Sequence, residues 1–398
     1  MKTIKYFALL LVTCFAFCLA SCTKTTGDAY KKFEKGGEIT YPGRADSVFV
    51  HPGNNRVQLA IVLGNDPLVT KIRVFYNNMQ DSTETPVTRT LGVDTVNIIV
   101  DKLTEGNYNF VIYTYDVKGH KSVVTNASGV VYGPSYTASL ANRNLKLAYF
   151  DDDGKATIDW GNAASDELGV ELKYINNSSL TKTIIVPKSE IYTKISDVKP
   201  NSQLTFRSLF KPDSTAFETF SPAVATAYFS NGLNKAKFKS LILPTDVLEG
   251  GYGWLEEFLW DDNYNPPGFA TESKVPCWFT FDSGISTAIT GFKVWQANDR
   301  LYDQQSVKAF ELYGSNNPNA DGSWGSWTKI GSYESVKPSG SAVGTNTDAD
   351  VAFALRGESF PVIAGTPKFR YFRFKLLSNF GNGDFMTMEE FSFFTNDH

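Results

Sequence analysis

The stretch Pro276-Cys277-Trp278-Phe279-Thr280-Phe281-Asp282-Ser283-Gly284 runs from a proline to a glycine, and its residues Phe279 to Asp282 alternate apolar and polar side chains. Alternation with a period of two indicates a β-strand, and proline and glycine are typical of the turns that bound one. Strand-like segments of this kind dominate the 398-residue chain, and no long apolar stripe with the helical period of 3.6 appears. The sequence therefore predicts an all-β protein.

Five further strand-like segments follow this stretch. They are residues 289–295 (ITGFKVW), 309–316 (AFELYGSN), 327–331 (WTKIG), 369–375 (FRYFRFK) and 388–394 (MEEFSFF). In order and character, these segments resemble the strands of discoidin domains, also called coagulation factor V/VIII type C domains. The resemblance implies a galactose-binding-domain-like jelly roll for residues 246–398, a β-sandwich of about eight strands. Residues 231–245 are predicted to be a linker in front of it.

The region before residue 230 contains the same pattern of strand residues twice. The positions Ile72, Val74 and Tyr76 recur 98 residues later as Val170, Leu172 and Tyr174. A repeat of this length, with short strands and turns between them, predicts two tandem β-sandwiches. We place them at residues 39–134 and 135–230.

Both copies resemble fibronectin type III domains. Leu103-x-x-Gly106-x-Tyr108-x-Phe110 in the first copy is similar to the corner between the fifth and sixth strands of that family, and Trp160 in the second resembles its core tryptophan. The Tyr41-Pro42-Gly43-Arg44 start and the tandem layout resemble fibronectin-like domains of lipoproteins in bacterial glycan-utilisation systems. The resemblance implies spacers, so we predict no binding site in either copy.

Residues 1–21 have the parts of a secretory signal. Lys2 and Lys5 precede an apolar run, residues 7–19, that is shorter than the ~20 residues needed to span a bilayer. Leu19-Ala20-Ser21-Cys22 resembles the bacterial lipobox, which implies lipidation of Cys22 and a membrane anchor, with residues 22–38 as a tether. We expect an outer-membrane lipoprotein at the cell surface. A periplasm-facing orientation is the alternative, because residues 23–27 lack the acidic side chains that often accompany surface export.

The charge balance limits the partners of this chain, and its cysteine content limits its disulfides. Two of the 38 Lys and Arg residues lie in the signal, which leaves 36 against 42 Asp and Glu. This acidic balance argues against nucleic acid or anionic lipid as the main partner. Only Cys277 remains besides Cys22 after the signal, so no disulfide is expected and the fold must rely on its aromatic-rich core.

The discoidin resemblance extends to carbohydrate-binding module family 32, in which loops at one end of the sandwich bind sugar. An aromatic ring packs on the apolar face of a pyranose, and polar side chains bind its hydroxyls. The predicted glycan-binding residues are Trp260, Asn263, Tyr264, Arg300, Tyr302, Trp324, Phe380 and Asn382. The alternative is that such aromatic residues fill the core, which we expect for Trp278, Trp295 and Trp327.

A calcium site is a further expectation. Asp261, Asp262 and Asn263 precede the Pro276 strand where discoidin domains place an Asp-Gly-Asn turn, which often binds structural Ca²⁺ through oxygen ligands. The intervening glycine is missing here. The run Asp151-Asp152-Asp153-Gly154 lacks the spacing of an EF-hand, so we interpret it as a hairpin turn.

The sequence does not favour an enzyme. Its three histidines, His51, His120 and His398, lie beside turns or at the end of the chain, and no nucleophile or phosphate-loop motif appears. Glycoside hydrolysis needs only two carboxylates, for which the adjacent pairs at 256–257 and 389–390 are the obvious candidates. No predicted domain is large enough to resemble a hydrolase barrel.

Together these observations predict a non-catalytic, lipid-anchored envelope protein with two spacers and a C-terminal domain that binds a poly- or oligosaccharide. The alternative is a structural or adhesion subunit that binds a protein, such as an outer-membrane transporter.

Overall fold

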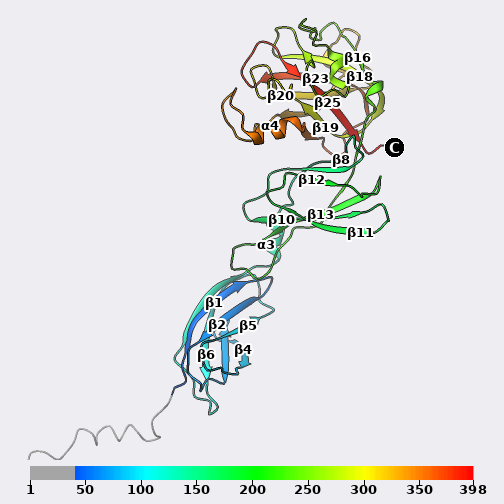
Figure 1. The fold of residues 1–398 in the computed structure, drawn as a ribbon. Coiled ribbons are helices and arrows are strands. Elements are labelled where there is room, and N and C mark those ends of the chain that lie inside the picture. The colour runs from blue at the N-terminus through cyan, green and yellow to red at the C-terminus, as the bar shows by residue number, and fades with distance from the viewer. Residues whose placement is uncertain (1–40, 398) are drawn as a thin grey trace, which may run out of the picture. The chain divides into compact units, whose positions relative to one another are not determined.

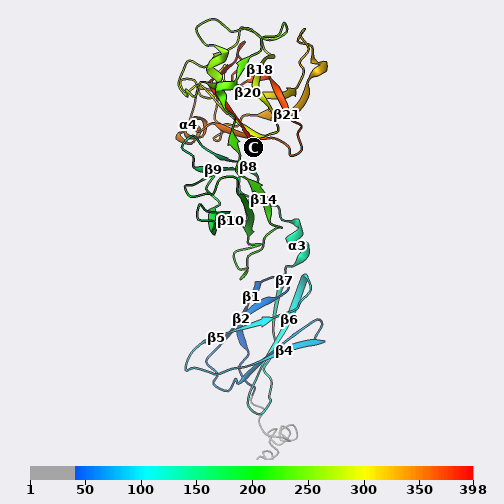
Figure 2. The same cartoon turned by 90° about the vertical axis from the view of Figure 1, so that its right-hand side faces the viewer.

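The computed structural model describes residues 41–397, and most of their regular secondary structure is β-strand (Figures 1 and 2). The predicted all-β fold class is confirmed. The described residues divide into two compact units, the first ending at Gly133 and the second beginning at Pro134. The predicted signal, Cys22 and the tether lie outside the described residues. Within residues 41–397, no helix is both long and apolar enough to cross a membrane.

The first unit is a sandwich of two antiparallel sheets. One sheet has the order β1 (Ala45–Pro52), β2 (Val57–Leu63), β5 (Asp94–Val100). The other has the order β4 (Asp81–Pro86), β3 (Lys71–Tyr76), β6 (Gly106–Tyr115), β7 (Thr125–Val131). Alternate residues of β2 are fully buried between the sheets, as the period-two pattern requires.

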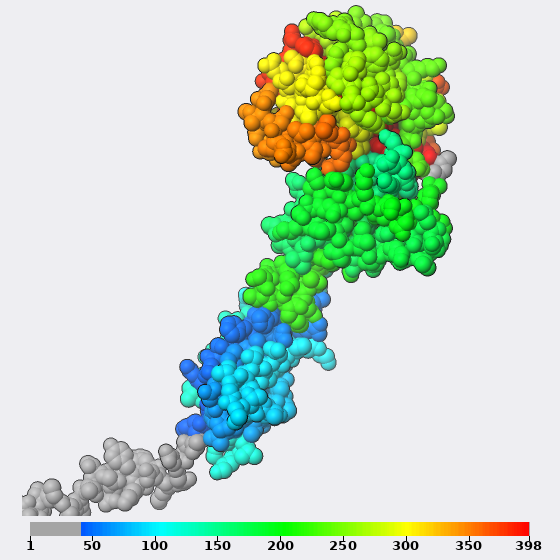
Figure 3. Space-filling view, in the orientation of Figure 1, coloured from blue at the N-terminus to red at the C-terminus, as the bar shows by residue number. Residues whose placement is uncertain are grey.

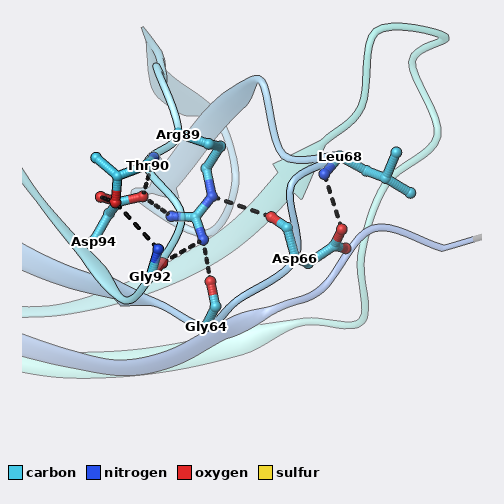
Figure 4. A network of polar contacts seen from close by, with 7 residues as sticks. All are labelled: Gly64, Asp66, Leu68, Arg89, Thr90, Gly92 and Asp94. Atoms are coloured by element: carbon cyan, nitrogen blue, oxygen red, sulfur yellow. Dashed lines mark hydrogen bonds and ion pairs between the residues drawn. The ribbon is translucent and has the colours of Figure 1, made fainter.

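A network of polar contacts holds one loop of this sandwich in place (Figure 4). The guanidinium of Arg89 pairs with the Asp94 carboxylate and donates to the backbone carbonyls of Gly64 and Asp66. The Thr90 hydroxyl donates to the same Asp94 carboxylate at 2.6 Å. Because each charged group has its partners within the network, we assign it to holding the loop before β5.

The second unit begins with α3 (Pro134–Ser139) and a second sandwich. Its sheets have the orders β8 (Leu145–Phe150), β9 (Ala156–Trp160), β12 (Tyr192–Ile195) and β11 (Thr181–Pro187), β10 (Glu167–Ile175), β13 (Gln203–Phe210), β14 (Ala225–Tyr228). This is the strand order of the first sandwich. The repeated residues also occupy equivalent strands, since Ile72 and Val74 lie on β3 while Val170 and Leu172 lie on β10, all four buried.

The second sandwich is followed by a jelly roll. Its larger sheet has the order β16 (Lys239–Ser240), β18 (Cys277–Thr287), β23 (Phe369–Asn379), β20 (Val307–Ser315), β21 (Thr328–Glu334). The smaller sheet has the order β15 (Asn231–Gly232), β25 (Glu390–Thr395), β19 (Ile289–Trp295), β22 (Glu358–Pro361). A two-stranded ribbon pairs β17 (Phe269–Ala270) with β24 (Thr387–Met388). The helices are η1 (Lys235–Lys237), η2 (Glu256–Trp260), η3 (Trp324–Ser326) and α4 (Asp348–Leu355).

Phenylalanine rings fill the space between the jelly-roll sheets. Phe281 of β18 and Phe374 of β23 are completely buried and contact Phe391 of β25 at centroid distances of 4.8 and 5.3 Å. Residues 231–245, which we expected to form a linker, supply β15, η1 and β16 to this domain. The jelly roll therefore begins directly after the second sandwich.

Candidate functional site

An aromatic cluster lies on the outer face of the larger jelly-roll sheet. The ring of Trp324, from η3, lies edge to face with Tyr313 of β20 at a centroid distance of 4.7 Å and with Trp278 of β18 at 5.1 Å. All three side chains are half-buried. We call these three residues the Trp324 platform.

Strand alternation explains why two of these rings point outward. Trp278 stands between the buried Cys277 and Phe279, so its side chain must lie on the opposite face of β18. Trp278 is paired in register with Lys375 of β23, whose ammonium lies 5.5 Å from the Trp324 ring centroid. The expectation that Trp278 fills the core is therefore wrong.

Charged groups border the platform. The Glu311 carboxylate accepts hydrogen bonds from Lys329 at 2.5 Å and from the Tyr313 hydroxyl at 2.9 Å, and it pairs with Lys375 at 3.3 Å. Although burial raises the pKa of Glu311, these partners outweigh it and lower this pKa to about 2. The border is therefore a fixed array of charges beside apolar rings.

Trp324 also has a packing role. It covers the completely buried guanidinium of Arg373, which lies 4.8 Å from the Trp324 ring and 4.5 Å from the Trp327 ring. Arg373 in turn donates to Asp246 at 3.1 Å. The Trp324 ring is thus packed on a buried, hydrogen-bonded guanidinium of the sheet beneath the platform.

Two of the predicted glycan-binding residues pack inside the domain. Trp260 is 9% exposed and lies 5.7 Å from the core ring of Phe281, while Tyr302 is only 1% exposed. Tyr302 has a φ of 52°, and this turn directs its ring inward against Phe380 at 5.2 Å. The structure therefore corrects the assignment of Trp260 and Tyr302 to the ligand surface, because their rings fill the interior.

Three other predicted residues lie on loops. The Arg300 guanidinium is bidentate to Asp299, with both contacts at 2.9 Å, and lies 4.4 Å from the Trp254 ring centroid. Phe380 is half-buried and Asn382 is exposed. Arg300 and Trp254 form a second pairing of an aromatic ring with a cation, separate from the Trp324 platform.

Tyr264 contacts the second sandwich, and Asn263 holds a local turn. The Tyr264 ring packs on Trp295 at 4.9 Å, and its hydroxyl donates to Asp152 of the second sandwich at 3.2 Å. Asn263 holds a local turn by donating to the carbonyl of Asn265. The eight predicted glycan-binding residues therefore do not form one site. The members of the platform that sequence reasoning missed are Trp278 and Tyr313, which strand alternation would have placed on the outer face.

The predicted calcium loop holds a lysine. The ammonium of Lys235 lies 2.8 Å from Asp262 Oδ1 and 2.8 Å from Glu390 Oε1, and this lysine is 9% exposed. Asp261 Oδ1 accepts a hydrogen bond from the backbone N–H of Asn263. Within residues 41–397, no group of three or more His, Cys, Asp or Glu side chains is arranged to hold a metal ion. This arrangement does not fit Ca²⁺, and calcium binding stays an untested prediction.

Glu256, Glu389 and Glu390 of the adjacent glutamate pairs are buried, and Glu257 is exposed. Burial raises the pKa of Glu256 to about 8 and that of Glu389 to about 7. Glu389 is completely buried, and neither of its carboxylate oxygens has a hydrogen-bond partner among the described residues. These carboxyls are placed in the interior of the fold.

Two family models match the sequence. Residues 22–220 match DUF4998, and residues 260–395 match DUF5000, each described as a domain of unknown function. No match is found among the curated proteins.

Solved structures resemble parts of the chain. The SusE-like protein BT2857 is 32% identical over 41% of this chain and 98% of its own, with a TM-score of 0.39. CBM32-3 from a family 31 glycoside hydrolase of Clostridium perfringens is 14% identical over 41% of this chain and 94% of its own, with a TM-score of 0.31. The FN1–FN3 domains of chicken CNTN1 are 13% identical over 48% of this chain and 65% of their own, with a TM-score of 0.28.

Because its model matches half of the sequence, DUF4998 is the family to which this chain belongs.

Proposed function

We propose that this protein is a non-catalytic, lipid-anchored protein of the cell envelope that binds glycan through its C-terminal jelly roll and so captures polysaccharide. The Trp324 platform carries this proposal. It combines three half-buried aromatic rings with charged side chains on one sheet face.

This combination suits the chemistry of a sugar ring. The C–H face of a pyranose is apolar and packs against an aromatic ring, while its hydroxyls require directional partners. Trp324 offers the ring and Lys375 offers a donor 5.5 Å from its centroid, while the Glu311 carboxylate beside them is held by Lys329 and Tyr313. The Glu311 carboxylate, whose pKa this network lowers to about 2, fixes the position of the Lys375 ammonium beside the ring.

The anchor and the location are part of the proposal. They rest on the lipobox-like Leu19-Ala20-Ser21-Cys22, which lies outside the described residues. Three acyl chains on Cys22 would hold the protein at the outer membrane, where a single chain gives only marginal binding. Protease treatment of intact cells distinguishes the two orientations, because only a surface-exposed jelly roll is digested.

Binding is tested with the purified protein by affinity electrophoresis in gels that contain plant, host or microbial polysaccharides. We expect retardation by at least one polysaccharide. If none retards the protein, the proposed function is wrong. A stoichiometric protein partner recovered from envelope extracts, together with no retardation, would favour the adhesion alternative.

A further inference from the structure

A cavity of about 290 Å³ lies within the second unit, between the second sandwich and the jelly roll. Its walls include Tyr149 and Thr157 from the second sandwich, and Tyr264, Lys293, Trp295 and Arg356 from the jelly roll. The volume is at the lower end of the ~300–1,000 Å³ range of small-molecule sites. It therefore suits a ligand of about the size of one sugar ring.

Contacts between the second sandwich and the jelly roll surround this cavity. The rings of Tyr149 on β8 and Phe394 on β25 are 4.8 Å apart, and the hydroxyls of Ser230 and Thr290 are hydrogen-bonded at 2.7 Å. Ser359 of β22 donates to Asp159 of β9 at 2.5 Å. Figure 3 shows the surface of this unit, with the region of α4 (orange) against the second sandwich (green). The cavity is thus formed before any ligand arrives.

Its lining is both aromatic and polar. Tyr264 and Trp295 pack together with an interplanar angle of 52°, and the Lys293 ammonium lies 5.1 Å from the Trp295 ring centroid. Lys293 also donates to the Tyr149 hydroxyl at 2.7 Å. Aromatic carbon beside directional donors is the lining that a sugar needs.

Two buried groups retain hydrogen-bonding capacity. Arg356 Nε and Asp159 Oδ1 form an ion pair at 3.5 Å, yet neither atom has a hydrogen-bond partner among the described residues. Arg356 lines the cavity and Asp159 does not, so the guanidinium is the group of this pair that a ligand hydroxyl would meet, as an acceptor.

The charges of the site are balanced. Lys194 pairs with Asp151 at 3.0 Å, Lys293 and Arg356 share Asp159, and Asp152 accepts from the Tyr264 hydroxyl. Asp159 lies behind the lining, and when it is counted the three cations of the cavity are matched by three carboxylates. A uronic acid or a phosphate would add an uncompensated negative charge, whereas a neutral sugar would not.

We infer that this cavity is a second carbohydrate site, separate from the Trp324 platform, and that it takes one neutral pyranose unit. The inference rests on the proposed glycan-binding function and adds a site to it. A polysaccharide end held in the cavity and a chain segment on the platform would then bind the same protein at two places.

The test plugs the cavity without removing a buried contact. Leu355 lines the cavity and is 50% exposed, so Leu355→Trp adds bulk from its rim. The matched control is Leu180→Trp, because Leu180 is 59% exposed on the β10–β11 hairpin of the same unit. The melting temperature of both variants confirms that they fold.

Saturation-transfer NMR and calorimetry are performed with methyl glycosides of galactose, N-acetylgalactosamine, glucose and mannose, and with glucuronic acid. We expect at least one neutral glycoside to bind wild type and Leu180→Trp equally, and Leu355→Trp at least tenfold more weakly. Glucuronic acid should bind more weakly than the neutral glycosides. Equal binding by the two variants, or tighter binding of glucuronic acid, overturns the inference. Retention by polysaccharide without binding of any methyl glycoside also overturns it but leaves the proposed function intact.

Discussion

The Nζ atom of Lys293 lies 3.8 Å from Asp159 Oδ2, and each of these two side chains is only 3% exposed. Lys293 belongs to the jelly roll and Asp159 to the second sandwich. Burial lowers the pKa of Lys293 to about 8, against the opposing effect of Asp159. An ion pair so completely removed from water depends on both partners being present.

Replacing Asp159 with alanine should strongly destabilise the second unit. The substitution leaves Lys293 and Arg356 without their shared carboxylate, and an unpaired buried charge costs about 3–5 kcal/mol. Denaturant unfolding followed by tryptophan fluorescence measures this loss. The control is Asp153→Ala, because the Asp153 side chain is 71% exposed. Equal unfolding free energies for the two variants would contradict a structural role for the buried pair.

Glu389 should make stability fall as pH rises. Burial, with smaller contributions from Asp299 and Asp261, raises the pKa of Glu389 from 4.5 to about 7. The folded protein therefore keeps this proton up to about pH 7, whereas the unfolded chain releases it near pH 4.5. The stabilisation from this group is complete below pH 4.5 and is lost as pH rises to 7, by at most about 3 kcal/mol.

Glu389→Gln removes this titration and keeps the shape of the side chain. We expect the variant to gain stability relative to wild type between pH 5 and pH 8 in thermal unfolding. A difference between variant and wild type that does not change with pH would show that Glu389 is ionised in the folded protein.

Calcium should not stabilise the wild-type protein, because the Lys235 ammonium already lies between Asp262 and Glu390. Thermal unfolding with calcium and with a chelator measures this. Lys235→Met should lower the unfolding free energy, since it removes the hydrogen bond that the buried Glu390 accepts from Lys235. A higher melting temperature of the wild type in calcium would support the metal site expected from the sequence.

Trp324→Ala should weaken polysaccharide retention at least tenfold, which corresponds to about 1.4 kcal/mol. The reason is the loss of the ring at the centre of the platform. Phe49→Ala is the control, since Phe49 is 56% exposed on β1 of the first unit. Quantitative affinity electrophoresis compares the two, and equal retention would exclude the platform as the binding surface.

Cys22→Ala should abolish membrane attachment. Metabolic labelling with a radioactive fatty acid should mark the wild-type protein and leave the variant unlabelled. Fractionation should move the variant from the membrane to the soluble fraction. Labelling of the variant at the wild-type level would mean that the lipid is carried elsewhere.

The period-two patterns predicted the all-β fold class, and the recurrence of Ile72 and Val74 as Val170 and Leu172 predicted the duplicated sandwich. A strand with one buried face has apolar residues at every second position of its own sequence, and β2 shows the matching alternation of burial. No comparable local pattern shows whether a loop residue is buried. Trp260 and Tyr302 looked like exposed loop aromatics, but η2 and a left-handed turn direct them into the core. Their positions depend on tertiary packing.

The charge of the predicted calcium loop shows the same limit. Lys235 binds Asp262 and Glu390, which are 27 and 155 residues away along the chain. No local motif relates these three residues, so the sequence alone could not predict that the Lys235 ammonium lies at this loop. Trp278 is the reverse case, because its outward direction was already present in the alternation of its own strand.

The pairing of β15 with β25 determines how the protein can be dissected. A recombinant fragment that starts at residue 246 would lack β15, β16 and Lys235, and would expose the edge of β25. Edges of this kind promote aggregation. Failure of such a fragment to bind sugar would therefore say little about the intact protein, whereas a fragment starting at Pro134 keeps the whole second unit.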